Sequence, residues 1–249
     1  MNELEKKFFE AFEGMSRLAP GSEASTQQAA DLINRRNEPL EILDIGCGNG
    51  VHTLLLARLF PHAAITAIDN HSFFIETLNQ SAASQGLSHR VRGKVADMFQ
   101  MPFAAESFDL IWSEGAIYII GFQRGLKEWK QLLKPGGILI CSEAVWLNET
   151  PTPEIFDFWN AEYPEIDMVP VKLQQVKNAG YTILGCFIMP SSDWEDYYRP
   201  LEENLKRMKE KEGHLEAVQE VTQALQYEID LYRLYGHEYS YAFFVMKKE

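Results

Sequence analysis

The chain has 249 residues, 46% of them hydrophobic, and a formal net charge of −13 at pH 7. This hydrophobic content can fill the core of one large domain. The negative charge disfavours a nucleic-acid partner, because binding to phosphate backbones requires clustered lysine and arginine. No apolar run approaches the roughly twenty residues that span a bilayer, and the charged N-terminus lacks the apolar stretch of a signal peptide. We therefore expect a cytoplasmic protein without membrane insertion.

The cysteines give no sign of a metal site or of a disulfide framework. Cys47, Cys141 and Cys186 each lie in or beside a predicted strand, and none belongs to a C-x-x-C or Cys/His pair with metal-ligand spacing. We interpret them as buried, reduced thiols and predict no metal.

The N-terminal part of the chain contains a predicted helix over about residues 24–36. A Pro-Gly-Ser turn precedes it. Either Ser22 or Ser25 is expected as its N-cap, because a serine hydroxyl can accept a hydrogen bond from an N–H group of the first turn.

Residues 41–69 have a strand–turn–helix–strand pattern. A strand over about 41–46 enters a turn that contains Gly46, Gly48 and Gly50, a leucine-rich helix leaves this turn, and a second strand over 64–69 ends at Asp69. Glycines allow the backbone to approach a ligand closely, and a carboxylate at the end of the second strand can accept both ribose hydroxyls of an adenosine. The pattern predicts a site for a nucleoside-containing cofactor.

The spacing of the glycines distinguishes two such cofactors. Dinucleotide sites have the spacing G-x-G-x-x-G, whereas this chain has G-x-G-x-G, with Asp44 two residues before Gly46. A carboxylate there would repel a pyrophosphate but suits a cation or an amino group. S-adenosylmethionine carries both a sulfonium and an ammonium group, so the spacing favours it over NAD.

Three later segments complete a family pattern. They are Val95–Met98, Ser107–Gly115 and Leu132–Ile140, at the predicted strands 91–96, 108–113 and 137–143. Together with Leu43–Gly50 they resemble, in order and spacing, the motifs of class I S-adenosylmethionine-dependent methyltransferases. The resemblance covers about residues 40–145. Outside that window the chain is similar only to the small-molecule branch that contains ubiquinone/menaquinone biosynthesis methyltransferases.

This resemblance implies a fold. It is an α/β fold with a doubly wound, seven-stranded, mainly parallel Rossmann-like sheet, strand order 3-2-1-4-5-7-6, and an antiparallel last strand. The sixth and seventh strands are predicted over 181–189 and 240–247. Helical stretches between the first five strands independently predict βαβ units.

The resemblance also implies which residues bind the cofactor. Asp69 is expected at the ribose, Asp97 at the adenine amino group, and Asn70 and Met98 on the two faces of the adenine. The predicted set is Asp44, Gly46, Cys47, Gly48, Asp69, Asn70, Asp97, Met98, Ser113 and Glu114.

Methyl transfer to a phenol, alcohol or amine can use a general base that removes the proton of the acceptor. The candidates are Glu143, Glu114 and Tyr118. Glu143 is expected at the end of the fifth strand, facing the acceptor; a buried or helix-capping role fits it equally well. His52 and His71 flank the cofactor loops and are interpreted as structural.

Two insertions are expected to form an acceptor-side cap on one domain that spans residues 1–249. Residues 146–170 are rich in proline and aromatic side chains, and residues 191–236 contain two helices. An apolar stripe on the second helix (215, 218, 221, 225, 229 and 232) is expected to pack on the sheet or on the first insertion. A group of aromatic side chains either lines an acceptor pocket or packs in the core: Tyr118, Trp146, Phe156, Trp159, Tyr163, Trp194 and Tyr198.

The prediction is a methyltransferase that acts on a small-molecule acceptor. One alternative is a catalytically silent S-adenosylmethionine-binding protein that acts through a partner. The other is an NAD-dependent oxidoreductase, which fits Asp69 but not the glycine spacing.

Overall fold

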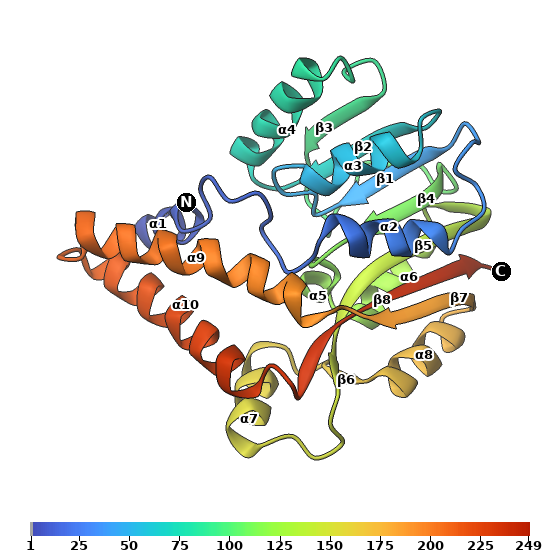
Figure 1. Cartoon of the computed structure of the whole chain (residues 1–249). Coiled ribbons are helices and arrows are strands. Elements are labelled where there is room, and N and C mark those ends of the chain that lie inside the picture. The colour runs from blue at the N-terminus through green and yellow to red at the C-terminus, as the bar shows by residue number, and fades with distance from the viewer. Residues whose placement is uncertain (1) are drawn as a thin grey trace.

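Eight strands form one mixed sheet in the computed structural model, which describes residues 2–249 (Figure 1). They are β1 (Glu41–Ile45), β2 (Ala64–Asp69), β3 (Val91–Val95), β4 (Phe108–Ser113), β5 (Leu133–Trp146), β6 (Asp167–Met168), β7 (Tyr181–Ile188) and β8 (Tyr239–Lys248). The order is β3-β2-β1-β4-β5-β8-β7. Strands β1 to β5 are parallel, and β8 is antiparallel to both β5 and β7. The expected fold class and strand order are confirmed.

Two details of the sheet differ from expectation. The two-residue strand β6 pairs with the end of β5, and such a short element has no periodicity to detect. Strand β5 extends from Leu133 to Trp146, beyond the predicted 137–143, because Leu133 pairs with Phe108 of β4 at its start and Trp146 pairs with Tyr239 of β8 at its end.

Ten helices accompany the sheet in the described part of the chain. They are α1 (Glu3–Glu10), α2 (Glu23–Asp31), α3 (Val51–Leu59), α4 (Ser72–Ser84), α5 (Ile117–Ile120), α6 (Phe122–Lys130), α7 (Pro153–Glu162), α8 (Val169–Asn178), α9 (Ser191–Glu212) and α10 (Glu216–Tyr235). None of them combines the length and apolar character that a membrane span requires. Ser22, one of the two expected alternatives, is the N-cap of α2.

Helices cover both faces of the sheet and create two cores. Alternation along β1 shows this division, because Ile42 belongs to one core while Leu43 and Ile45 belong to the other. The first core contains side chains of α2, α3 and α4, and the second contains side chains of α5, α6 and α8. The two cores therefore hold the strands in place beneath the loops that contain the predicted motif residues.

Helices α9 and α10 form an antiparallel pair that extends away from the sheet toward α1 (Figure 1). The apolar stripe of α10 is buried at Val218, Val221, Leu225 and Ile229. It packs chiefly on α9 and α1, whereas the sheet or the first insertion was expected. Helix α10 also contacts the first insertion, where Tyr227 packs edge-on against Phe158 of α7. The sequence does not predict α1. This helix is short, more than half of its residues are charged, and none of its residues is buried, so it lacks the buried apolar face that marks a core-facing helix.

Candidate functional site

A cavity of about 420 Å³ lies at the carboxyl ends of β1, β2 and β4, where open α/β sheets bind ligands. Nine of the predicted site residues line it: Gly46, Cys47, Gly48, Asp69, Asn70, Asp97, Met98, Glu114 and Tyr118. Asp44, Ser113 and Glu143 do not belong to its lining. The structure thus brings most of the predicted set together at one place.

The glycine turn after β1 needs its glycines for two reasons. Gly46 and Gly48 have φ angles of 72° and 52°, which side chains other than glycine rarely adopt. A Cβ atom at Gly46 would lie 2.4 Å from the Cβ atom of Ala116, and one at Gly48 would lie 2.8 Å from a methyl group of Leu18. The turn is therefore packed between two neighbouring segments, with its backbone toward the cavity.

Asp69 is held in place at the end of β2 by two backbone donors. The N–H of Gly48 donates to Oδ2 at 3.0 Å, and the N–H of His71 donates to Oδ1 at 2.9 Å. Burial raises the pKa of Asp69 above its ordinary value, although these two donors act in the opposite direction. Each oxygen accepts one bond and retains acceptor capacity. The carboxylate can thus receive two hydroxyl groups from a ligand in the cavity.

Asp97 occupies a more exposed position in the cavity wall. Its Oδ1 atom accepts a hydrogen bond from the N–H of Phe99 at 2.9 Å, and the side chains of Met98 and Phe99 lie beside it in the lining. A flat ring placed here would meet apolar surface and one carboxylate oxygen that can accept a hydrogen bond.

Asp44 lies beneath the cavity, beside a histidine that lines it. Its Oδ2 atom accepts a hydrogen bond from Thr53 at 2.5 Å, and its Oδ1 atom lies 3.3 Å from Nε2 of His52, which does line the cavity. Burial lowers the pKa of His52, but the charges of Asp44 and Glu114 outweigh burial and raise it. Asp44 follows Ile42 on the α3 face of the strand, which explains why it points away from the cavity.

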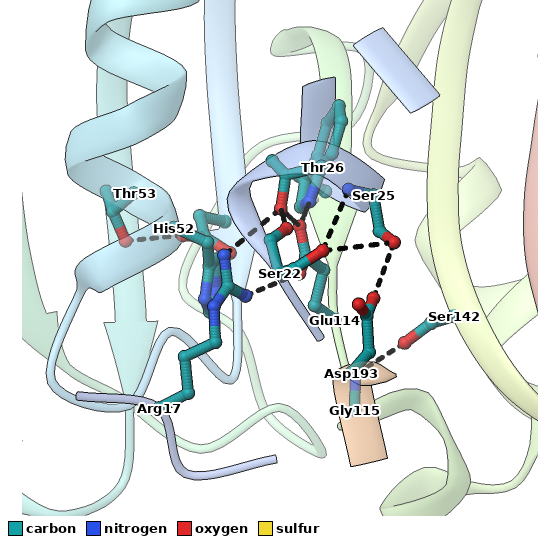
Figure 2. A network of polar contacts seen from close by, with 12 residues as sticks. Arg17, Ser22, Ser25, Thr26, His52, Thr53, Glu114, Gly115, Ser142 and Asp193 are labelled. Carbon is teal, nitrogen blue, oxygen red and sulfur yellow. Dashed lines mark hydrogen bonds and ion pairs between the residues drawn. The ribbon is translucent and has the colours of Figure 1, made fainter. Parts of the chain in front are cut away.

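Glu114 ties the N-terminal segment to the end of β4 (Figure 2). It is almost fully buried and accepts hydrogen bonds from Thr26 at 2.8 Å and from the indole of Trp112 at 2.8 Å. It also forms an ion pair with Arg17 at 3.1 Å. A carboxylate with these three partners is well satisfied, which suits an anchor better than a base that must gain a proton.

A second part of this network connects the same segment to the cap. Ser25 donates to Asp193 at 2.5 Å, and the N–H of Gly115 donates to Ser142 at 2.7 Å (Figure 2). Asp193 belongs to the first turn of α9. The N-terminal segment, the loop after β4 and the cap are therefore joined through buried polar contacts.

Glu143 differs from the expectation that it faces the acceptor. It pairs with Ala242 in the middle of the β5–β8 ladder, because β5 continues to Trp146. Its side chain is fully buried, 2.5 Å from Nζ of Lys172, and accepts a hydrogen bond from Tyr163 at 2.7 Å. Burial raises the pKa of Glu143, while Lys172 and Tyr163 act to lower it. This ion pair joins α8 to the sheet.

Ser113 lies below the cavity, whereas Tyr118 lines it. Ser113 is buried and donates to the carbonyl of Ile45 at 3.0 Å, so it fastens β4 to β1 below the cavity. Tyr118 belongs to α5 and lines the cavity, and its ring packs edge-on against Tyr163 with centroids 5.9 Å apart.

The far end of the cavity is built from the cap and β8. Trp159 of α7, Trp194 and Tyr197 of α9, and Tyr241 of β8 contribute aromatic surface. Leu225 and Glu228 come from α10. Phe8, Phe9 and Phe12 of the N-terminal region also line the cavity, and Phe9 packs on His71 beside the loop after β2, with ring centroids 4.2 Å apart. Of these, sequence analysis had considered only Trp159 and Trp194 as pocket residues. The helical spacing placed Leu225 on an apolar stripe, but no local signal marked Glu228, Tyr197 or Tyr241.

This geometry defines a class of protein: an α/β protein with a nucleoside-cofactor cradle and an aromatic chamber beside it. The chain belongs to the methyltransferase domain family, whose family model matches residues 36–212. The methyltransferase resemblance is therefore confirmed.

Relatives with known names show what the chain is similar to. The sterol 24-C-methyltransferase of Aspergillus fumigatus is 29% identical over 186 residues, covering 69% of this chain and 48% of that protein. The ubiquinone/menaquinone biosynthesis C-methyltransferase of Geotalea daltonii is 35% identical over 104 residues, covering 41% of this chain and 44% of that protein. The chain spans about half the length of the curated relatives it matches.

A solved structure matches over nearly the whole chain. It is an S-adenosylmethionine-dependent methyltransferase from Geobacter sulfurreducens in complex with S-adenosylhomocysteine. Its TM-score is 0.86 at 20% identity, covering 98% of each chain. At this identity the likeness establishes the fold alone.

Proposed function

We propose that the protein transfers the methyl group of S-adenosylmethionine to a small-molecule acceptor. The observation that carries the proposal is the continuity of one cavity, which begins at the glycine turn and Asp69 and ends at the aromatic chamber of the cap. Donor and acceptor can therefore lie in contact. In-line displacement at a sulfonium mainly needs such alignment, because the leaving group is already good.

The residues at the cradle fit the cofactor. Asp69 retains acceptor capacity for two ribose hydroxyls, and Asp97 offers an oxygen to an adenine amino group. The backbone of Gly46 and Gly48 faces the cavity for the amino-acid portion. Asp44 and His52 place their charges near that portion from below. The bound cofactor would supply an activated methyl group.

The cap supplies the acceptor side in this proposal. Residues 146–170 contribute Trp159 to the cavity through α7, and residues 191–236 contribute Trp194, Tyr197 and Glu228 through α9 and α10. Glu114 and Glu143 act as anchors. A metabolite is the expected partner, since the net charge of −13 opposes nucleic acid. Three unpaired cysteines support a cytoplasmic location.

Two measurements test this function. Calorimetric titration should show binding of S-adenosylhomocysteine that is much tighter than binding of NADH, and tighter NADH binding would instead support an oxidoreductase. Incubation with methyl-labelled S-adenosylmethionine and a metabolite extract should then label a small molecule. Cofactor binding without any labelled product would favour the silent binding protein.

A further inference from the structure

One carboxylate stands in the aromatic end of the cavity. Among the lining residues that the cap and β8 contribute in the described chain, Glu228 alone is acidic, and none is basic. Its neighbours in this lining are Trp159, Trp194, Tyr197, Leu225 and Tyr241. Glu228 is half-buried, and these neighbours leave its carboxylate fewer water molecules than an exposed acid has.

One oxygen of Glu228 is held and the other is not. The hydroxyl of Tyr198 donates to Oε1 at 2.8 Å. Within residues 2–249, Oε2 accepts no hydrogen bond, although Glu228 lines the cavity. This geometry fixes the carboxylate and leaves one oxygen for a donor group of a ligand.

The groups around Glu228 are mostly phenols. Burial raises the pKa values of Tyr118 of α5, Tyr197 of α9 and Tyr241 of β8, and the charge of Glu228 raises them further. The same two causes raise the pKa values of Tyr239 and Tyr198. Burial raises the pKa of Glu228, as does the charge of Glu162 of α7, while the bond from Tyr198 lowers it. No cation faces it in this set.

The basic side chains of the cavity are engaged elsewhere. Arg17 and His52 are the basic residues in the described lining, and they pair with Glu114 and Asp44 near the glycine turn. An acceptor with a carboxylate or phosphate near Glu228 would therefore meet a like charge without compensation, which disfavours its binding.

We infer that Glu228 is the base of the acceptor site, and that the acceptor is a neutral or cationic small molecule with an apolar body and one O–H or N–H group, such as a phenol or an amine. This inference rests on the proposed methyl transfer. The acceptor's oxygen or nitrogen forms a bond to the methyl carbon as the bond from that carbon to sulfur breaks. The electron pair of the broken bond stays on sulfur, and the acceptor's proton passes to Oε2 of Glu228.

Three probes of one shape test the charge preference: 4-propylphenol, 4-propylaniline and 4-propylbenzoate. At about pH 8 the first two are neutral and the third is an anion. Each is titrated by calorimetry into the full chain saturated with S-adenosylhomocysteine. The wild type should bind the phenol and the aniline more tightly than the benzoate, by a factor of about ten or more in affinity. In Glu228→Gln the benzoate should gain affinity until the difference falls to about threefold or less.

A matched control uses the same helix. Glu220 is an exposed residue of α10 outside the lining of this cavity, so Glu220→Gln should keep the wild-type ranking. Methyl transfer from labelled S-adenosylmethionine to 4-propylphenol should fall by about a hundredfold or more in Glu228→Gln, the effect typical of a lost general base. If Glu228→Gln melts well below the wild type, Glu228→Asp is measured in its place. This variant should still bind the benzoate weakly, and it should transfer the methyl group to 4-propylphenol more slowly than the wild type.

The outcomes separate the two proposals. Failure of the wild type to bind S-adenosylhomocysteine would overturn the proposed function. Binding of S-adenosylhomocysteine together with equal affinity for the three probes, or with none for the phenol and the aniline, would overturn the acceptor class alone. An unchanged transfer rate in Glu228→Gln would remove Glu228 as the base.

Discussion

The carboxylate of Asp69 accepts a hydrogen bond from the backbone N–H of Gly48, and this 3.0 Å contact joins the end of β2 to the loop after β1. The same carboxylate accepts a second bond from the N–H of His71. Both loops are thereby fixed around the position proposed for the ribose, before any ligand arrives. Such preorganisation reduces the entropy that binding must overcome.

Asp69→Ala should weaken binding of S-adenosylhomocysteine more than Asp97→Ala does. Asp69 can make two charge-assisted bonds to hydroxyls, each about 1.5–3 kcal/mol before compensation by water, whereas Asp97 offers one contact to a neutral amino group. Calorimetric titration of both variants measures the difference. An Asp69→Ala affinity equal to that of the wild type would remove Asp69 from the site.

Gly46→Ala should abolish detectable binding of S-adenosylhomocysteine, because the new Cβ atom would lie 2.4 Å from that of Ala116 at a φ angle of 72°. Gly86→Ala is the matched control. Gly86 has a φ angle of 70°, but a Cβ atom added there would have no other atom within 4 Å. It should lose only about 1–2 kcal/mol of stability from backbone strain and keep its affinity for the cofactor product. Equal binding by the two glycine variants would contradict the close packing described for the turn.

Lys172→Met should destabilise the protein by about 3–5 kcal/mol, because it leaves the fully buried Glu143 without its partner charge. The double variant Glu143→Leu/Lys172→Met removes both charges and should recover most of this loss. Urea unfolding measures the free energies. If the double variant is as unstable as Lys172→Met, the ion pair contributes more to the free energy of unfolding than the neutralisation of two buried charges.

Trp159→Ala should leave affinity for S-adenosylhomocysteine nearly unchanged while reducing methyl transfer to 4-propylphenol, since Trp159 lines the aromatic end of the cavity. Tyr163→Phe removes the bond to Glu143 from a residue outside the lining. It should lower the melting temperature with little change in turnover per folded molecule. Reversal of these two effects would show that α7 packs as core and that Tyr163 contacts the acceptor.

Stability should decrease as the pH rises above the ordinary histidine value of about 6.5. Asp44 and Glu114 raise the pKa of His52 in the folded state, so the protonated form contributes stability below about pH 6.5, and this contribution is lost as the pH rises through the raised value. His52→Gln should flatten that dependence. Urea unfolding at a series of pH values measures it, and an unchanged slope would assign the dependence to other groups.

The parts of the fold that follow one local rule could be predicted from the sequence. Strands β1, β2 and β4 follow apolar runs, whereas β3 has the mixed sequence Val-Arg-Gly-Lys-Val, and the bounds of all four agree within one residue with those predicted. The motif residues lie where such strands end, which explains why Asp69 and Asp97 reach the cavity.

Other features depend on contacts between distant segments. Glu143 appeared to end a strand, but pairing with β8 extends β5 past it. Glu228 and Tyr241 lie on α10 and β8, which meet the motif loops only in the folded chain. Neither residue belongs to a motif, so no interpretation of local spacing could have placed them together.

The packing of α1 against α10 connects the two ends of the cavity. Helix α1 contributes Phe8 and Phe9 to the cavity lining, with Phe9 against His71 beside the proposed ribose position, and α10 contributes Leu225 and Glu228 at the proposed acceptor end. The helix beside the proposed cofactor position therefore packs against the helix that lines the proposed acceptor position. If α1 moves to release the spent cofactor, we expect α10 to lose one of its two main packing partners and to keep the other, α9, so that release of the cofactor product should also loosen the opposite end of the cavity.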